Sequence, residues 1–328
     1  MTGWLILIAK IIIVLMVLLT CAGYLVLVER KLLGRFQLRP GPNRVGPWGM
    51  WQPLADGIKL LLKEDTVPAG ADRVLFLLAP AVVALVPLLL FAVIPLGPDW
   101  RLGEWTIPLV ISDLNVGLLY ILALSSLSVY GVVLGGWASH STFSLLGGLR
   151  GAAQMISYEL AMGLSLVPIV MLANSFSLTA IVAAQGHLPF VLVQPLSFII
   201  FLLSAMAEAK RLPFDLPEAE NELMAGYHTE YSGMRFALYF LGEYLNMILL
   251  GALAAVFFLG GWHGPLLPAP LLLALKILPF PLLMIWTRAT LPRLRYDQLM
   301  QLGWQVMIPL ALANIVVTGA IILWRQGG

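Results

Sequence analysis

An acidic segment interrupts an otherwise very apolar chain. Residues 208–230 read EAKRLPFDLPEAENELMAGYHTE and hold six of the 17 Asp and Glu residues, although 60% of the chain is hydrophobic. Carboxylates are costly near lipid, so we expect such a cluster only where its charge has a function. Because the segment separates two long apolar runs, we expect it at a membrane surface or in a cavity that opens from one. Its residue types are suited to proton handling or to binding a polar headgroup.

The carboxylates within this segment are closely spaced. Pro217 is suited to the first position of a helix. Such a helix places Glu218 and Glu222 on one face and Glu220 on another. Acids this close resist ionising together, which suits groups that exchange protons. The structural alternative is a solvated acidic loop that pairs with nearby Lys and Arg side chains. The flanking apolar runs enclose the cluster, so we favour the functional interpretation.

Three carboxylates lie in or beside apolar runs, namely Glu159, Glu208 and Glu243. An ionisable residue inside a membrane span is a functional candidate by default. All three lie toward the same end of their helices, so we expect one buried polar track to join them to the acidic segment. Lys276, in the middle of another apolar run, is a buried cation without an obvious partner.

The composition is typical of a polytopic membrane protein. Only 11% of the residues are charged, and a net charge of +2 is too small to indicate nucleic-acid binding. The single cysteine, Cys21, is insufficient for an internal disulfide, an iron–sulfur cluster or a zinc site. The four histidines lie outside the apolar runs, and no nucleotide-binding glycine motif is present. We therefore expect no redox centre in this chain.

The apolar runs define the fold class. A membrane span needs about 20 mostly apolar residues, and runs of this length are helices rather than barrel strands. The sequence therefore predicts an all-α membrane protein with a single membrane domain, 1–328. It predicts eight spans, at approximately 4–28, 74–96, 114–137, 153–173, 189–207, 234–260, 266–287 and 304–324.

The positions of the basic residues predict the orientation. Fourteen of the 19 Lys and Arg residues lie in the connections 29–73, 138–152, 208–233 and 288–303, and a fifteenth, Arg235, lies just after the third of these. Arg101 is the only basic residue in the intervening connections. By the positive-inside rule the first set of connections is cytoplasmic, and both termini then face outward.

The connection 29–73 combines a basic run, a rigid turn and a surface helix. Its RPGPNRVGP stretch contains too many Pro and Gly residues to be helical. From Trp48 to Leu62 the apolar residues recur at helical spacing with charged residues around them. An interfacial helix anchored to lipid headgroups is the simpler interpretation. The rigid turn is harder to explain in this way, because anchoring does not require so much conformational restriction.

Four long segments indicate a family. They read ERKLLGRFQLRPGPNRVGPWG, GGLRGAAQMISYEL, RLPFDLPEAENELMAGYHTEYSGMRFALYFLGEY and RATLPRLRYDQLMQLGW, in this order along nearly the whole chain. They closely resemble the H subunit of bacterial respiratory complex I, whose mitochondrial counterpart is NADH dehydrogenase subunit 1. The resemblance implies an eight-helix subunit of a proton-pumping NADH:quinone oxidoreductase, in the bacterial inner membrane, at the junction with the hydrophilic arm.

The resemblance also implies a division of roles among residues. In that family quinone reaches the terminal iron–sulfur cluster of a soluble subunit through a tunnel that this subunit partly lines. The implied tunnel and junction residues are Arg30, Arg39, Asn43, Arg44, Phe214, Asp215, Glu218, Glu220 and Glu222. The implied proton relay consists of Glu159, Glu208 and Glu243.

The same resemblance implies the substrate and the partners. Quinone is the substrate, whereas FMN and the iron–sulfur clusters belong to partner subunits. The implied partners are the soluble quinone-cavity and cluster subunits, the adjacent small membrane subunits and membrane lipid. The family usually has Asn at the position of Lys210, which places a cation two residues after Glu208 that could pair with it and lower its pKa.

Two other functions stay open at the level of sequence. The first is a related subunit of a membrane-bound hydrogenase that uses no quinone, against which the RPGPNRVGP and PFDLPEAE segments argue. The second is a secondary transporter that works as a single chain. Transporters bind substrates near the bilayer midplane, whereas the polar residues here are concentrated on one side.

Overall fold

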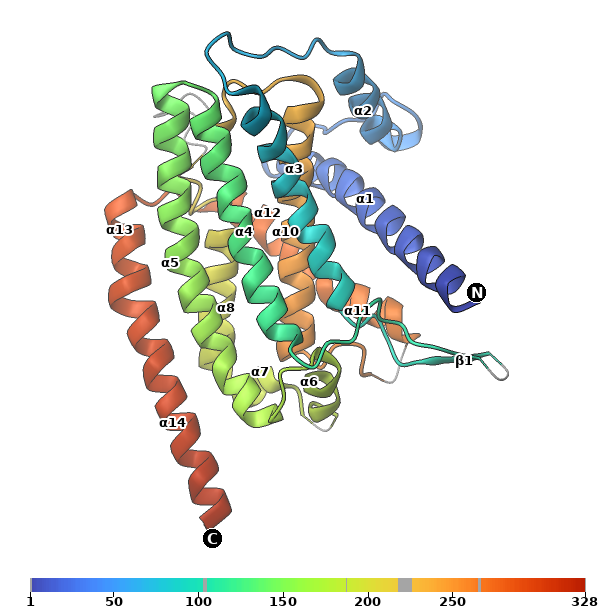
Figure 1. The fold of residues 1–328 in the computed structure, drawn as a ribbon, viewed down its shortest axis with the longest axis vertical. Coiled ribbons are helices and arrows are strands. Elements are labelled where there is room, and N and C mark those ends of the chain that lie inside the picture. Colours follow the sequence, from blue (N-terminus) through green and yellow to red (C-terminus); the bar gives the residue numbers. More distant parts are fainter. Residues whose placement is uncertain (1, 103–104, 187, 218–225, 265–266, 328) are drawn as a thin grey trace.

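A computed structural model describes residues 2–102, 105–186, 188–217, 226–264 and 267–327 (Figure 1). Within these residues, seven helical segments are long and apolar enough to cross a membrane, which confirms the all-α polytopic fold class. They are α1 (Thr2–Phe36), α3 (Arg73–Leu90), α4 (Gly117–Ala138), α5 (Thr142–Ala173), α10 (Gly233–Phe258), α11 with α12 (Ala269–Ile277 and Pro279–Thr290), and α13 with η4 and α14 (Tyr296–Gln301, Leu302–Met307 and Ile308–Gly327).

The remaining elements are short. Helix α8 (Pro195–Glu208) is apolar but has only 14 residues. The others are η1 (Pro47–Gly49), α2 (Gln52–Leu62), η2 (Phe91–Val93), α6 (Leu178–Ala184), α7 (Phe190–Val193) and η3 (Gly226–His228). A hairpin of strands β1 (Trp100–Leu102) and β2 (Trp105–Ile107), with Arg101 opposite Thr106, adds a small sheet that the sequence did not predict.

Each of the eight predicted spans contains a helix, but the helix ends differ from the predicted span ends. Helix α1 continues to Phe36, and α5 begins at Thr142, because a helix can project beyond the hydrocarbon layer. The predicted span 189–207 is divided into α7 and α8, which are separated at Gln194 by non-helical backbone. Pro279 and Pro281 mark the junction of α11 and α12, where a proline removes a helical hydrogen bond.

The helices form a bundle, and its outer helices expose apolar side chains on the side that faces away from the core. Helices α3, α4 and α5 pack side by side, α10 packs against α3 and α1, and α14 lies along α5 at one edge (Figure 1). Residues of α10 from Leu249 to Phe258 are buried all around, as expected for a helix inside a bundle. In contrast, Trp4 of α1 and Val316 of α14 are more than 70% exposed. These apolar outer surfaces require lipid or another apolar partner, so the chain is an integral membrane protein.

One end of the bundle carries the long polar connections. Segment 37–72, including α2, lies at the upper end in Figure 1, whereas the C-terminus lies at the lower end and the N-terminus lies at the right, at about mid-height. Asp65 forms an ion pair with Arg235 at 3.0 Å, and Thr66 is hydrogen bonded to Ser232. Asp72 then caps α3 by accepting two hydrogen bonds from backbone N–H groups. These contacts fix the connection against the start of α10, beside the acidic segment.

Candidate functional site: a buried ion-pair network beside a polar cavity

Glu208 lies inside the bundle, at the end of the short helix α8. At about 1.5 Å per residue, α8 is roughly 21 Å long, which is less than the roughly 30 Å thickness of a hydrocarbon core. The side chain of Glu208 is buried. Gln154 of α5 holds this end of α8, because its Nε2 donates to the backbone carbonyls of Ala207 and Phe214, each at 2.7 Å. Irregular backbone at this depth is tolerated when protein groups satisfy it in this way.

A buried ion-pair network joins four elements. Glu29 of α1 accepts a hydrogen bond from Nη1 of Arg211 at 3.1 Å, and it also pairs with Arg288 of α12. Nη2 of Arg211 lies 3.8 Å from Oε2 of Glu243 on α10. The guanidinium of Arg211 lies 4.8 Å from the centre of the Tyr244 ring. Because the Glu29, Arg211 and Glu243 side chains are at most 7% exposed, removing one partner would leave a charge buried without its counter-ion.

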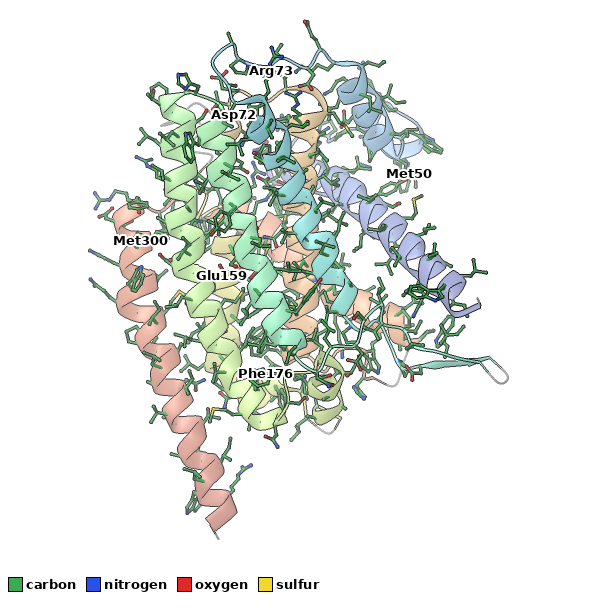
Figure 2. The ribbon with its side chains drawn as sticks, viewed as in Figure 1. Met50, Asp72, Arg73, Glu159, Phe176 and Met300 are labelled. Atoms are coloured by element: carbon green, nitrogen blue, oxygen red, sulfur yellow. The ribbon has the colours of Figure 1, made fainter. Side chains whose placement is uncertain are left out.

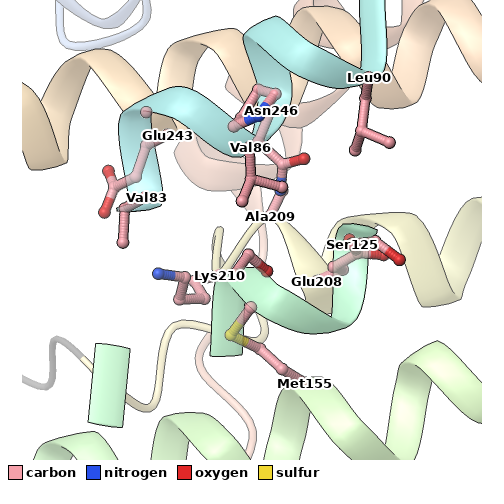
Figure 3. A pocket seen from close by; sticks show the side chains of 13 residues that line it. Val83, Val86, Leu90, Ser125, Met155, Glu208, Ala209, Lys210, Glu243 and Asn246 are labelled. Carbon is pink, nitrogen blue, oxygen red and sulfur yellow. The ribbon is translucent and has the colours of Figure 1, made fainter. Parts of the chain in front are cut away.

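A small cavity with a mixed polar and apolar lining adjoins this network (Figure 3). Its volume is about 20 Å³, enough for about one water molecule, and its lining includes Glu208, Lys210 and Glu243. Nζ of Lys210 donates to Oη of Tyr227 at 3.2 Å, and Tyr227 donates to Oε1 of Glu243 at 3.1 Å. Among the described residues no ion pair joins Lys210 to Glu208, although the charge of Lys210 acts on Glu208; Lys210 contacts the hydroxyl and the ring of Tyr227.

Glu159 is linked to the same cavity through a serine. The Oγ atom of Ser125, on α4, donates to Oε1 of Glu159 at 2.7 Å, and Ser125 also lines the cavity. Glu159 is half-buried and lies about midway along α5 (Figure 2). The structure therefore places the three predicted relay carboxylates around one space: Glu208 and Glu243 line it, and Glu159 is bonded to its wall.

Phe214 and Asp215 follow α8 and lie beside the network. Phe214 is buried, and its ring lies 5.8 Å from that of Tyr158 on α5. Oδ1 of Asp215 lies 3.8 Å from Nη2 of Arg293. Burial raises the pKa of Asp215 to about 6; the charge of Glu243 contributes to the rise, and the nearby arginines oppose it. Asp215 is therefore a carboxyl group that changes charge close to physiological pH.

The predicted junction residues of the first connection lie apart from this network. Arg30 forms an ion pair with Asp56 of α2 at 2.6 Å, at a partly exposed position. Asn43 and Arg44 line a separate open groove of about 470 Å³, and Arg39 is exposed. Among the described residues, no hydrogen bond or ion pair joins the side chains of Arg39, Asn43 or Arg44 to the buried network. The predicted residues Glu218, Glu220 and Glu222 lie outside the described residues.

Sequence reasoning missed several residues of the site. The sequence marks Glu29 only as the border of the first span, and Arg288 only as a basic residue of a connection. Gln154 and Tyr227 stand in the family segments, but nothing in their spacing indicates their partners. The sequence signal that could have indicated this ion pair is Glu29 itself. A carboxylate that follows 20 or more apolar residues is costly to bury, so it needs a cationic partner.

Lys276 corrects another expectation. Its Nζ donates to the carbonyls of Leu259, Gly261 and His263 at 2.6, 2.8 and 2.8 Å. The prediction of a cation without a partner was therefore wrong. Lys276 satisfies carbonyls at and beyond the C-terminal end of α10, where a positive charge is also favoured by the helix dipole.

Fold and site together define a class of protein: an integral membrane protein with a cavity of carboxylates and a buried ion-pair network toward the end of its bundle that carries the long connections. Comparison with known proteins makes this specific. The sequence profile of the family described as NADH dehydrogenase matches residues 9–319. The chain belongs to this family, which confirms the resemblance to the H subunit of bacterial complex I.

Named relatives match over almost their whole length. A protein of Syntrophobacter fumaroxidans, named as the second H subunit of NADH-quinone oxidoreductase, is 67% identical, over 98% of this chain and 97% of the relative. The NADH-quinone oxidoreductase H subunit of Syntrophotalea carbinolica is 63% identical, over 94% of this chain and 93% of the relative. The first H subunit of Geobacter metallireducens is 62% identical, over 97% of this chain and 96% of the relative.

Proposed function

We propose that this chain is the membrane subunit of an NADH:quinone oxidoreductase that lines the path of the quinone and couples quinone reduction to proton translocation. Family membership and the names of its relatives support the enzyme complex. The observation that carries the coupling role is the cavity shared by Glu208 and Glu243, with Glu159 bonded to its wall. In this proposal the chain holds no redox centre, and electrons arrive from a partner subunit that carries an iron–sulfur cluster.

The coupling begins at the segment that follows α8. Quinone reduction takes up protons or creates negative charge near Phe214 and Asp215. Asp215 responds because its pKa of about 6 lies close to the working pH. Glu218, Glu220 and Glu222 follow directly in the chain and change protonation in the same step. Interacting acids of this kind titrate as a group rather than singly.

The change in charge then passes to the cavity. Asp215 and Glu243 influence each other's charge, and Glu243 shares the cavity with Glu208. Ser125 connects the cavity to Glu159, which is half-buried on α5. Through Glu159 the site biases adjacent small membrane subunits. Arg30, Arg39, Asn43 and Arg44 shape the junction with the soluble subunits on the side of the bundle that carries α2.

The orientation follows from the same proposal. The end of the bundle with α2 and the acidic segment faces the cytoplasm, where it meets the soluble subunits that hold FMN and iron–sulfur clusters. Both termini then face the outer side of the bacterial inner membrane. The predominance of Lys and Arg in the connections at the α2 end supports this orientation.

The test is a purification through this chain in mild detergent, followed by assays of NADH:quinone reduction and proton pumping. We expect a large iron–sulfur complex whose activity is abolished by an inhibitor that blocks the quinone path. In that complex, Glu208→Gln should lower reduction and pumping together, and so should Glu159→Gln. Glu64→Gln, at an exposed position, is the matched control and should leave both unchanged. Co-purification of an active hydrogenase, or of this chain alone, contradicts the proposed complex, and full activity of both carboxylate variants contradicts the coupling.

A further inference from the structure

Lys210 places a buried cation in the wall of the carboxylate cavity. Its side chain is 5% exposed, and its backbone adopts a left-handed conformation with φ of +52°. This conformation is strained for a residue with a side chain, so the surrounding structure must hold it in place. A buried ammonium group is costly unless it is hydrogen bonded and paired with negative charge. The position therefore combines two costs, which points to a role for the charge.

The hydrogen bonds of Lys210 have a fixed direction. A Lys ammonium group donates only, so Oη of Tyr227 must accept from Nζ at 3.2 Å. The phenolic proton of Tyr227 is then directed to Oε1 of Glu243, at 3.1 Å. Arg211 lies 3.8 Å from the other oxygen of Glu243. Glu243 thus receives positive charge and a hydrogen-bond donor from two sides, and both favour its ionised form.

Glu208 lacks such a hydrogen-bond donor in the same cavity, although the charge of Lys210 also reaches it. Its Oε2 is buried and accepts no hydrogen bond from the described residues. In Figure 3 the Lys210 amino group points to the side of Glu243, whereas Glu208 lies toward Ser125. When two neighbouring carboxyl groups have environments this different, one remains charged and the other exchanges protons.

We propose that Lys210 is a positioning residue: through Tyr227 it holds Glu243 as an anion, and it leaves Glu208 as the carboxyl group of the cavity that gains and loses a proton. The inference rests on the proposed function. In the exchange, Glu208 takes a proton from a hydronium ion, so an O–H bond breaks there as one forms on Glu208, and the proton later returns to water; Lys210 and Tyr227 keep their protons. Because Glu243 stays negatively charged and Lys210 stays positively charged, the net charge of the rest of the cavity does not change during that step.

Other charged or titratable groups also face this region. Among the described residues they include Glu29 on α1, Glu159 on α5, Tyr239 and Tyr244 on α10, His228 on η3, and Arg211 and Asp215 after α8; the cavity-lining residues of α3 and α4 are uncharged. Of these, Arg211 acts on Glu243 in the same sense as Lys210. Removal of Lys210 therefore weakens the positive field at Glu243 without abolishing it, and the expected effect is a shift rather than a complete loss.

The test uses the assembled complex and the pH dependence of NADH:quinone reduction. Lys210→Gln removes a cation that stabilises the negative charge of Glu243 and that also reaches Glu208, so the acidic limb of the profile should move up by about one pH unit. Tyr227→Phe removes only the bridging hydroxyl and should move the limb in the same direction. Lys210→Arg keeps the charge and should restore the wild-type limb. A residue that matters only for packing would change the yield of complex and leave the limb in place.

The outcomes separate this inference from the proposed function. If the wild-type complex reduces quinone, an unmoved limb in both Lys210→Gln and Tyr227→Phe overturns the role of Lys210 and leaves the proposed function standing. A limb that moves equally in Lys210→Gln and Lys210→Arg also overturns it, because charge is then not the cause. If Lys210→Gln does not assemble, the smaller change Tyr227→Phe decides alone. A wild-type complex without quinone reductase activity contradicts the proposed function itself.

Discussion

Replacing Glu29 with Gln tests whether the buried ion pairs hold the site together. Glu29 lies 3.1 Å from Arg211 and pairs also with Arg288, and its side chain is 3% exposed. At an effective dielectric constant of about 20, unit charges at this separation attract by about 5 kcal/mol. Part of that attraction offsets the cost of taking the charges out of water, so the net value of the pair is smaller. Removing one partner, however, leaves two guanidinium groups that face each other without their shared anion.

We therefore expect Glu29→Gln to destabilise the chain by about 3–5 kcal/mol, the range for breaking a buried ion pair. For a chain of this size the change corresponds to a fall in Tm of roughly 4–7 °C. The measurement is thermal unfolding of the detergent-purified complex, together with the yield of assembled complex. Quinone reduction should fall as well, because Arg211 also contacts Glu243 across the cavity wall.

A double-mutant cycle with Arg211→Gln separates the pair from the rest of the network. We expect the two changes together to cost less than the sum of the single changes, because each single variant leaves a charge unpaired. The matched control is Asp297→Asn, which breaks a shorter pair with Arg295, at 2.8 Å, whose side chains are 76% and 56% exposed. That change should cost less than about 1 kcal/mol. A coupling energy below about 0.5 kcal/mol, or equal effects of the buried and exposed changes, would refute the reasoning.

Three further changes test other parts of the structure. The pKa of Asp215, about 6, lies above its ordinary value, so the fold favours the protonated form; stability should fall as pH rises from about 4 through about 6. Between about pH 4.5 and about pH 7.5 the free energy of unfolding should fall by on the order of 2 kcal/mol. Thermal unfolding at these two pH values measures the fall, and Asp215→Asn should abolish it. An equal loss of stability in the variant contradicts the assignment to Asp215. Gln154→Leu leaves two buried carbonyls without donors, so we expect about 1–3 kcal/mol of destabilisation and lower quinone reduction; unchanged thermal stability contradicts this expectation. In Gly147→Ala the new Cβ would lie 2.8 Å from Cα of Gly226, so the yield of assembled complex should decrease. The control is Gly57→Ala, because Gly57 has open space around it. Equal yields of the two variants would show that α5 and η3 can separate at no cost.

The fold class of the protein and several of its candidate residues can be predicted from the sequence alone. Long apolar runs must become helices in lipid, because no water is present to satisfy a backbone that is not hydrogen bonded internally. The fold class and the family segments can therefore be recognised from the sequence alone, and so can Asp215 within PFDLPEAE as a candidate. Glu159, Glu208 and Glu243 stand out for the same reason, since a carboxylate in an apolar run is rare enough to be noticed.

What the sequence could not supply is which of these residues meet. Glu29 and Arg288 are 259 positions apart, and their pairing depends on how α1 and α12 cross. Because α8 is short, it ends inside the bundle and leaves Glu208 there. The backbone of Lys210 is in the left-handed region, and its side chain is hydrogen bonded to Tyr227. Local sequence determines where a helix can form and where a charge is costly. Only the packed tertiary structure decides which charges are neighbours, because ion pairs depend on distances of a few ångströms between segments far apart in the chain.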